Sequence, residues 1–392
     1  MNSITSNAAF CVSNIGGGAS NSVLSRQWFA RPADQRFLTL DDLAASVGAR
    51  RQRSIEARSN SRDLALRGAA EIRTREDMHD LFISTADGDR AMTHWSFGQL
   101  AGLAKAPAGY LRTLPAPMVA DNLNYGLRFA RDAEAVKLYY DDADLLAATG
   151  PDYGRIFDED VVRAVQNVVG NGAETRWKVP GRLDWSTMIY DPLHPVSIES
   201  TTLYASDRDV FLFLVDDLNP IQIGVAPNGD PDYVFRGFYV SNSEFGSRRF
   251  VIAGFYLRGL CENRIMWGVE GFQEVSMRHS KYAPARFVEE IRPALASFAN
   301  GSETRLREAV AQAKAAKVAS DDDEAVAFLR AREFSKARAL DVLAAVEREE
   351  GRPARSVWDF AQGITAVARA ERNTDTRLDL ELTAGKLLDK VA

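Results

Sequence analysis

The chain has 392 residues, of which 46% are hydrophobic and 26% are charged, and its formal net charge is −6. This length allows more than one domain, and the composition is that of a globular protein with a sizeable core. The negative charge excludes a uniformly basic nucleic-acid-binding surface, but a local basic groove remains compatible with it, because binding follows the local field.

The start of the chain predicts a flexible tail, since residues 1–25 are rich in Ser, Asn and Gly. This segment lacks the basic start and apolar centre of a signal peptide. No apolar run approaches the roughly 20 residues of a membrane helix. Cys11 and Cys261 are too few for a disulfide framework or a zinc site. We therefore expect a cytoplasmic protein that does not contact membranes.

The N-terminal part is predicted to be mainly helical. Thr39 is placed to cap a short helix, residues 95–114 favour two short helices, and residues 118–131 favour another. Between them, residues 49–68 hold six arginines against Glu56 and Asp63. Arginine suits phosphate binding, but a solvated basic loop is the simpler interpretation. A strand over 135–140 and a helix capped by Asp158 follow.

The middle of the chain predicts an antiparallel sheet. Residues 201–218 form a hairpin pattern whose turn is Ser206-Asp207-Arg208-Asp209. Residues 233–240 and 249–255 are further strands, and 257–266 favours a buried continuation.

From residue 283 the pattern is helical, with helices predicted over 284–317, 324–350, 357–369 and 378–391. We therefore predict an α+β protein with a helical N-terminal part, a central, mostly antiparallel sheet and a helical C-terminal region. Its domains are a tail (1–25), an α+β core (26–282) and the helical region (283–392).

Residues 232–268 hold the densest mixture of polar, basic and aromatic side chains. A polar loop is predicted at Ser241, Asn242, Ser243 and Glu244. The candidate phosphate-binding residues are Arg236, Arg248, Arg249, Arg258 and Arg264. Tyr239 and Phe245 are candidates for stacking on bases. Basic and aromatic residues alternate in single-strand-binding grooves. A sheet that buries its aromatics in a core has the same composition, and this is the alternative.

An acidic set offers a second hypothesis, in which a metal such as Mg²⁺ supports phosphoryl chemistry. Its candidate ligands are Glu199, Asp207, Asp209 and Glu244. Aspartate is also an ordinary turn residue, which is the simpler interpretation. The four histidines show no metal-ligand spacing. Cys261 has no histidine placed to activate it, which favours a buried core residue.

Several segments together resemble a known family. They are SRQWFARPADQRFLTLDDL (25–43), DYGRIFDEDVVRAV (152–165), STTLYASDRDVFLFL (200–214), VSNSEFGSRRF (240–250) and LRGLCENRIMWG (257–268). This set is similar to the phage/plasmid-like protein family known as domain of unknown function 932, and the helical C-terminus resembles the family's usual tail. The resemblance implies a protein of a mobile element and brings no established activity.

We therefore expect a nucleic-acid-binding protein of a phage, plasmid or integrated element that binds or anneals single-stranded DNA, needs no cofactor and forms homo-oligomers. One alternative is a metal-dependent enzyme acting on nucleic acid or nucleotides. The other is a structural or partner-binding protein whose helical tail docks a second chain.

Overall fold

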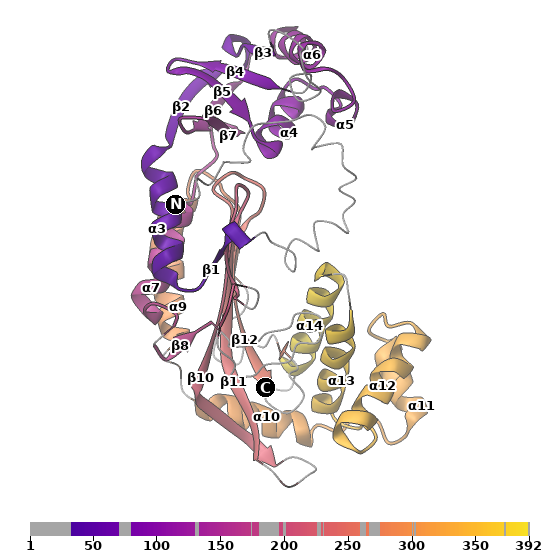
Figure 1. Ribbon diagram of the computed structural model, residues 1–392. Helices are drawn as coiled ribbons and strands as arrows, with labels where there is room; N and C mark the ends of the chain where they lie inside the picture. The colour runs from indigo at the N-terminus through magenta and orange to yellow at the C-terminus, as the bar shows by residue number, and fades with distance from the viewer. Residues whose placement is uncertain are drawn as a thin grey trace.

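The computed structural model describes residues 33–69, 80–129, 133–173, 175–179, 196–198, 201–225, 229, 231–258, 264–265, 275–299, 301, 303–371 and 374–390. The predicted tail lies outside these ranges. Figure 1 shows an elongated, curved molecule in which an N-terminal lobe, a large sheet and a C-terminal helical region follow one another. The α+β class, the central sheet and the helical C-terminus are confirmed.

The N-terminal lobe contains a six-stranded sheet that the sequence pattern did not predict. Its strands are β2 (Ile55–Asn60), β3 (Leu66–Gly68), β4 (Leu81–Thr85), β5 (Gly88–Met92), β6 (Ala135–Tyr140) and β7 (Asp144–Thr149). They lie in the order β2-β6-β7-β5-β4-β3, and the pair β5–β7 is parallel. A 3₁₀ turn, η2 (Ser61–Asp63), follows β2. The helices α4 (His94–Leu103), α5 (Ala108–Leu111) and α6 (Ala116–Phe129) share one apolar core with this sheet.

This lobe corrects the interpretation of residues 49–68 as a solvated loop. The segment forms the end of α3 (Leu40–Arg53), then β2, η2 and β3. Strand β2 pairs along its whole length with β6, which lies about 80 residues later in the chain. Pairing at that sequence distance leaves no local pattern. The strand was therefore not predicted, and the basic composition alone favoured a loop.

The large sheet is antiparallel throughout its described pairs. Its strands are β1 (Arg36–Phe37), β8 (Trp177–Lys178), β9 (Leu203–Ala205), β10 (Val210–Val225), β11 (Pro231–Asn242), β12 (Phe250–Arg258), β13 (Arg264–Ile265) and β14 (Val275–Met277). The main path is β1-β9-β10-β11-β12-β13, with β8 on β10 and β14 on β12. The predicted hairpin at Ser206–Asp209 is confirmed by the pairing of β9 with β10.

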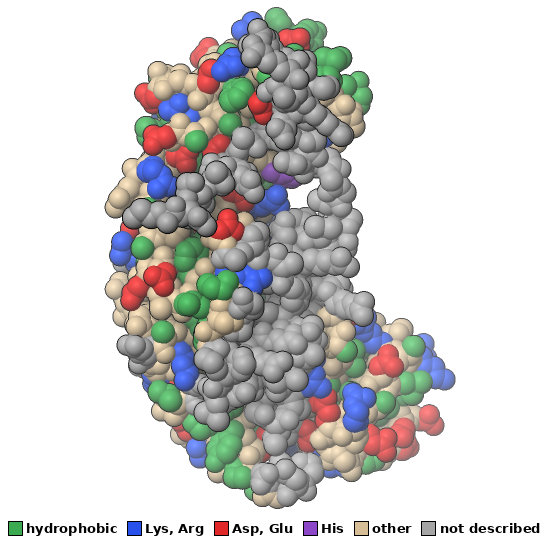
Figure 2. Space-filling view, in the orientation of Figure 1, with side chains coloured by type: hydrophobic (Ala, Val, Ile, Leu, Met, Phe, Trp, Pro, Cys, Tyr) green, Lys and Arg blue, Asp and Glu red, His purple; other side chains and the backbone are tan. Residues whose placement is uncertain are grey.

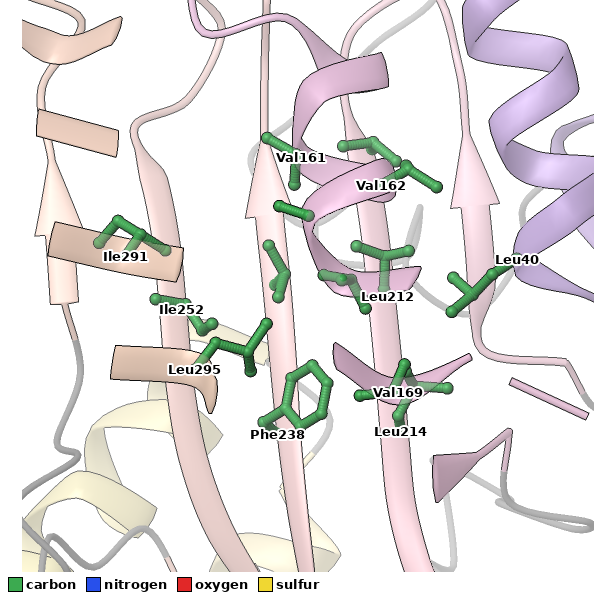
Figure 3. Packing of buried hydrophobic residues seen from close by; sticks show 14 of the residues in the cluster. Leu40, Val161, Val162, Val169, Leu212, Leu214, Phe238, Ile252, Ile291 and Leu295 are labelled. Carbon is green, nitrogen blue, oxygen red and sulfur yellow. The ribbon is translucent and has the colours of Figure 1, made fainter. Parts of the chain in front are cut away.

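Both faces of this sheet are buried, and side chains alternate between them. Leu212, Leu214 and Phe238 face a core shared with α3, α7 (Asp158–Val169) and α9 (Arg292–Ala299), shown in Figure 3. The short helix α8 (Ala283–Arg286) and the π-helical turn η4 (Phe287–Ile291) lead into α9. Phe213 and Phe255 stack on the opposite face at a centroid distance of 4.5 Å. The strands are therefore almost continuously apolar.

The helices of the C-terminal region share a second core with Ile221, Val234 and Tyr256 of the large sheet. These helices are α10 (Glu303–Ala315), α11 (Asp322–Arg330), α12 (Lys336–Glu350), α13 (Val357–Ala370) and α14 (Thr374–Leu388). The predicted single helix over 324–350 is wrong, because Ser335 caps a new helix after a break in which Glu333 adopts a positive φ of 68°. Helices begin at residue 283 as predicted, but α8, η4 and α9 belong to the core of the large sheet.

Candidate functional site

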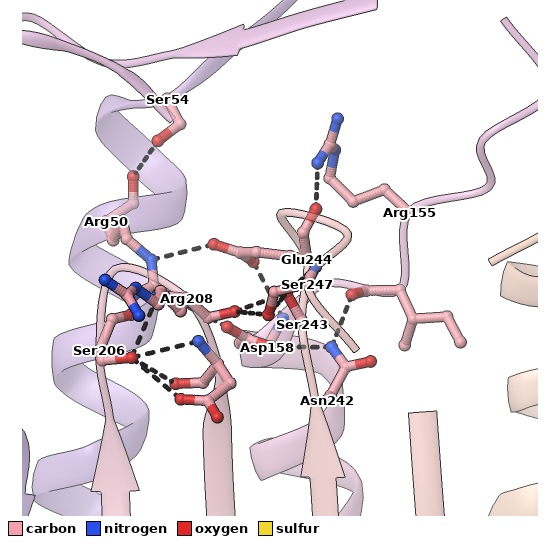
Figure 4. Close-up of polar contacts among 12 residues, drawn as sticks. Arg50, Ser54, Arg155, Asp158, Ser206, Arg208, Asn242, Ser243, Glu244 and Ser247 are labelled. Carbon is pink, nitrogen blue, oxygen red and sulfur yellow. Dashed lines mark hydrogen bonds and ion pairs between the residues drawn. The ribbon is translucent and has the colours of Figure 1, made fainter. Parts of the chain in front are cut away.

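The N-terminal lobe meets the large sheet at a junction of four chain segments. They are the end of α3, the start of α7, the β9–β10 turn (206–209) and the β11–β12 connection (243–249), shown in Figure 4. Polar side chains from all four converge here. The predicted polar loop lies at this place, although Ser241 and Asn242 belong to β11 and only Ser243 and Glu244 leave the strand.

Arg50 is the centre of a buried group that we call the junction cluster: Arg50, Arg155, Asp158, Asn242 and Glu244. Its Nε donates to Glu244 Oε1 at 2.9 Å and its Nη2 to Asp158 Oδ2 at 2.7 Å. Its Nη1 donates to the carbonyl oxygen of Ser206 at 2.8 Å. One guanidinium therefore joins α3, α7, the β9–β10 turn and the β11–β12 connection (Figure 4).

The carboxylates of the cluster have further donors. Asn242 Nδ2 donates to Asp158 Oδ1 at 2.7 Å, and the backbone N–H of Asp158 donates to Glu244 Oε2 at 3.0 Å. Asp158 was predicted to cap α7; it is instead the first helical residue, and Phe157 is the N-cap. Arg155 Nε donates to Glu56 Oε2 at 2.9 Å, and its Nη1 donates to the carbonyl oxygen of Glu244. The cluster thus also binds β2 of the lobe.

The pKa values in this cluster reflect burial and close opposite charges. Burial and the neighbouring Glu244 raise the pKa of Asp158 well above its usual range. Burial alone lowers the pKa of Arg50, but Glu244 and Asp158 outweigh it, so the pKa is raised. Burial and Glu244 raise the pKa of Tyr139 to about 12. The two carboxylates of the cluster are buried and both pair with Arg50, so the cluster is suited to holding the junction together.

Two side chains of α4 attach the lobe to the β11–β12 connection. Trp95 Nε1 and Gln99 Nε2 both donate to the carbonyl oxygen of Phe245, at 3.0 and 2.9 Å. Gln99 Oε1 accepts from the backbone N–H of Ala148 in β7 at 2.8 Å. The hydroxyls of Ser243 and Ser247 donate to the carbonyl oxygen of Arg208. The N-terminus of α4 and the β9–β10 turn are therefore held on either side of one connection.

A second group at the same junction, which we call the cationic patch, consists of His94, Arg112 and Arg208. His94 is the first residue of α4, Arg112 follows α5 with its guanidinium 5.7 Å from the Phe97 ring of α4, and Arg208 lies in the β9–β10 turn. All three side chains are half-buried. Arg112 Nε is shielded from solvent and has no hydrogen-bond partner among the described residues. Figure 2 shows a histidine beside a basic side chain where the lobe meets the sheet.

In the patch, burial and neighbouring arginines lower the pKa values of basic side chains. Burial, Arg208 and Arg112 lower the pKa of His94 to about 4. Burial and Arg208 lower the pKa of Arg112. The neighbouring charges that shift these two pKa values are cations, unlike those around Arg50. His94 is thus neutral at pH 7 beside two guanidinium groups.

The acidic residue of the same turn also faces a like charge. Burial, followed by Asp141 and Asp207, raises the pKa of Asp144 to about 7. In the β9–β10 turn, Asp207 therefore acts on an acidic residue of the lobe, Asp144, and Arg208 acts on the basic residues His94 and Arg112. These like charges of the turn and the lobe do not neutralise each other. A bound proton would neutralise the acidic pair, and a bound anion would neutralise the basic one.

The structure places the two predicted stacking residues inside the protein, which corrects that expectation. Phe245 is 0% exposed and lies against Tyr139 at a centroid distance of 6.1 Å. Tyr239 is 5% exposed and belongs to the aromatic face of the large sheet, next to Phe211. Their rings have no face available to a base, so the alternative interpretation, a core, holds for both.

The predicted phosphate-binding arginines do not form one surface. Arg236 is buried in β11 opposite Asp216, and Arg248 forms an ion pair with Asp209, with 3.2 Å between Nε and Oδ2. Arg249 is exposed at the end of the β11–β12 connection. The side chains of Arg258 and Arg264 lie outside the described ones, although their backbones belong to β12 and β13. Among the candidates whose side chains are described, Arg249 is the exposed one.

The predicted acidic metal ligands are separated in the structure. Glu244 pairs with Arg50, Asp209 pairs with Arg248, and Asp207 is exposed. Glu199 and Cys261 lie outside the described residues. Within the described part of the chain, no three His, Cys, Asp or Glu side chains are grouped so that they could hold a metal ion. The metal hypothesis receives no geometric support there.

Sequence reasoning singled out neither Arg112 nor His94 for binding. Arg208 was noticed only because it stands between two aspartates. The three residues are separated by up to 114 positions in the chain, so no local pattern connects them. Only the tertiary structure brings them close enough for Arg208 to act on the pKa values of His94 and Arg112.

No family model, no curated protein and no solved structure matches this chain. Among the described helices, none has the length and apolar character needed to cross a bilayer. What the protein does must therefore be argued from the junction itself.

Proposed function

We propose that this protein binds single-stranded nucleic acid through its phosphate groups at the cationic patch. The observation that carries the proposal is that two half-buried arginines from different parts of the fold, Arg112 and Arg208, act on each other and on the neutral His94. Like charges held together are unfavourable unless an anion lies between them. Arginine forks donate two parallel hydrogen bonds to a phosphate, and Arg112 and Arg208 bring two half-buried guanidinium groups to this place.

The position of the patch favours a flexible strand over a duplex. The three side chains are half-buried at a junction between the lobe and the large sheet. Duplex DNA is stiff on the length scale of a protein, whereas a single strand can bend into such a site. The exposed Arg249, on the connection that joins the two parts, offers a further phosphate contact.

The resemblance to a phage/plasmid-like family supports a role in the replication or recombination of a mobile element, with strand binding or annealing as the activity. On this proposal the protein works in the cytoplasm and self-associates along the strand. Cooperative binding along a strand is usual for proteins of this kind.

The direct test is binding of fluorescently labelled single- and double-stranded DNA over a series of salt concentrations. We expect single-strand binding that weakens with salt, because phosphate contacts release counterions. The double variant Arg112→Gln/Arg208→Gln should bind about tenfold or more weakly and with a shallower salt slope. Arg286→Gln/Arg307→Gln is the matched control, because it also removes two positive charges and both exposed arginines pair locally along the chain, with Glu290 and Glu303.

Absence of binding to either DNA at low salt would refute the proposal. Equal loss of affinity in Arg286→Gln/Arg307→Gln and in Arg112→Gln/Arg208→Gln would also count against it, because it would mean that only net charge matters. Salt-independent binding would remove the phosphate contacts from the explanation.

A further inference from the structure

The solvent face of α6 carries two aromatic rings where polar side chains would be expected. Phe129 is 70% exposed and Tyr125 is 68% exposed, the two largest values among the exposed large hydrophobic side chains of the described residues. Their ring centroids are 5.2 Å apart, and their planes are tilted by 47°. They are four positions apart, so they lie one turn apart on the same side of the helix.

The rest of α6 explains why these rings stay in solvent. The opposite face carries Val119, Leu123 and Leu127, which are buried in the core of the lobe. That face packs against the core of the lobe, whereas Tyr125 and Phe129 point away from this core and do not contribute to it. Exposed rings on a rigid helix lose little conformational entropy when a flat ligand stacks on them.

Two features distinguish this surface from a protein-docking face. Apolar side chains at 118, 125 and 129 form a stripe one residue wide, and the exposed Asp121, Asn122 and Arg128 border it. A stable protein interface buries on the order of 1,200 Å² or more, which a stripe of this width does not provide. Planar rings presented singly between polar groups suit the stacking of separate bases.

The stripe also lies in the part of the molecule that carries the cationic patch. Helices α4, α5 and α6 lie on the same side of the lobe in Figure 1. Tyr110, 59% exposed, is a further ring on the surface of this lobe, at the end of α5. Phosphate contacts and aromatic rings are thus combined within one lobe.

We infer that Tyr125 and Phe129 form a stacking platform for the bases of a single-stranded nucleic acid whose phosphates bind at the cationic patch. This inference rests on the proposed function and extends it, because it assigns the preference for single strands to named rings. The aromatic residues predicted from the sequence, Tyr239 and Phe245, are buried, and the two rings on α6 take over the stacking role.

The test separates bases from phosphates by using two probes of equal length and charge: an oligothymidylate and an abasic oligonucleotide. We expect the variant Tyr125→Ser/Phe129→Ser to bind oligothymidylate about tenfold or more weakly, with unchanged affinity for the abasic strand. Tyr125→Phe should keep wild-type affinity, since it retains the ring. Tyr282→Ser is the matched control, because Tyr282 is 63% exposed and lies at the start of α8, outside the lobe.

The outcomes distinguish this inference from the proposed function. If the wild type binds both probes and the double variant binds them unchanged, the platform is wrong while phosphate binding stands. If the wild type binds neither probe, the proposed function fails and the platform fails with it. If the double variant loses self-association in sedimentation but keeps its oligothymidylate affinity, the stripe contacts a second copy of the chain, and the inference is overturned.

Discussion

The junction cluster and the cationic patch lie at the same junction and use the same cationic residue type in opposite ways. In the cluster, Arg50 donates to two buried carboxylates and one carbonyl oxygen. In the patch, the charges that act on His94 and Arg112 are those of other arginines. The first arrangement is internally neutralised, whereas the second keeps uncompensated positive charge.

This difference separates a structural role from a binding role. A buried ion pair becomes strongly destabilising when one partner is removed, because the other charge stays buried without compensation. A group of like charges behaves in the reverse way, since removing one member relieves repulsion. Stability measurements on single variants can therefore assign each arginine to one class.

The largest effect is expected for Arg50→Ala. The variant leaves Asp158 and Glu244 buried without their common cation, which should lower the free energy of unfolding by about 3–5 kcal/mol. Urea denaturation followed by circular dichroism measures this change. Arg286→Ala, at an exposed pair with Glu290, is the control and should leave stability nearly unchanged, because solvent screens this pair. Similar small losses in both variants would contradict the structural role of the cluster.

The next largest effect is the loss of stability at acid pH that we expect from His279. Its ring stacks on Tyr153 at a centroid distance of 5.0 Å. Burial lowers its pKa from 6.5 to about 4. The unfolded chain therefore takes up the proton at a higher pH than the folded protein does. The stability that neutral His279 contributes is complete above pH 6.5 and is lost as the pH falls towards 4. The loss should amount to about 1–3 kcal/mol.

The comparison that isolates His279 is wild type against His279→Gln from pH 7 to pH 4. Asp144 titrates with the opposite sign, because its raised pKa of about 7 adds stability as the pH falls. The wild-type curve alone therefore mixes the two effects. The stability difference between wild type and variant should shrink on acidification, and a constant difference would contradict the assignment.

A smaller effect is expected for Gly246→Ala in the β11–β12 connection. Gly246 has φ of +90°, and an added Cβ would lie 3.3 Å from Gln99 Nε2, one of the groups that attach the lobe. We expect a loss of about 1–2 kcal/mol in urea denaturation. Gly109→Ala is the control, because nothing lies within 4 Å of its added Cβ. Equal stability of the two variants would mean that the connection adapts without strain.

The smallest effect on stability is expected for Arg208→Gln, within about 0.5 kcal/mol of wild type. Its backbone contacts with Ser243 and Ser247 remain, and one like charge is removed from the patch. The same variant should raise the pKa of His94 above about 4, as followed by NMR of the imidazole protons. A large loss of stability, or an unchanged His94 pKa, would remove the distinction between the cluster and the patch.

Elements with a strong local pattern were predictable from the sequence. The capped helix at Thr39, the strand β6, the turn at Ser206–Asp209 and the helical C-terminus all appear in the structure. Each depends on residues within about 20 positions, through capping, alternation or turn chemistry. The strands of the N-terminal lobe were missed, because β2 pairs with a distant partner and β3 is short.

By itself, the sequence determined the α+β class, the antiparallel order of the central strands and the concentration of polar residues between β11 and β12. Only the tertiary structure decided which charges meet. Arg50 reaches Glu244 across 194 positions, and Arg208 acts on the pKa of His94 in α4 from a different part of the chain. Burial likewise decided that Phe245 is core while Phe129 is solvent-exposed. Electrostatic energies and burial depend on distances in space, which composition and spacing along the chain do not specify.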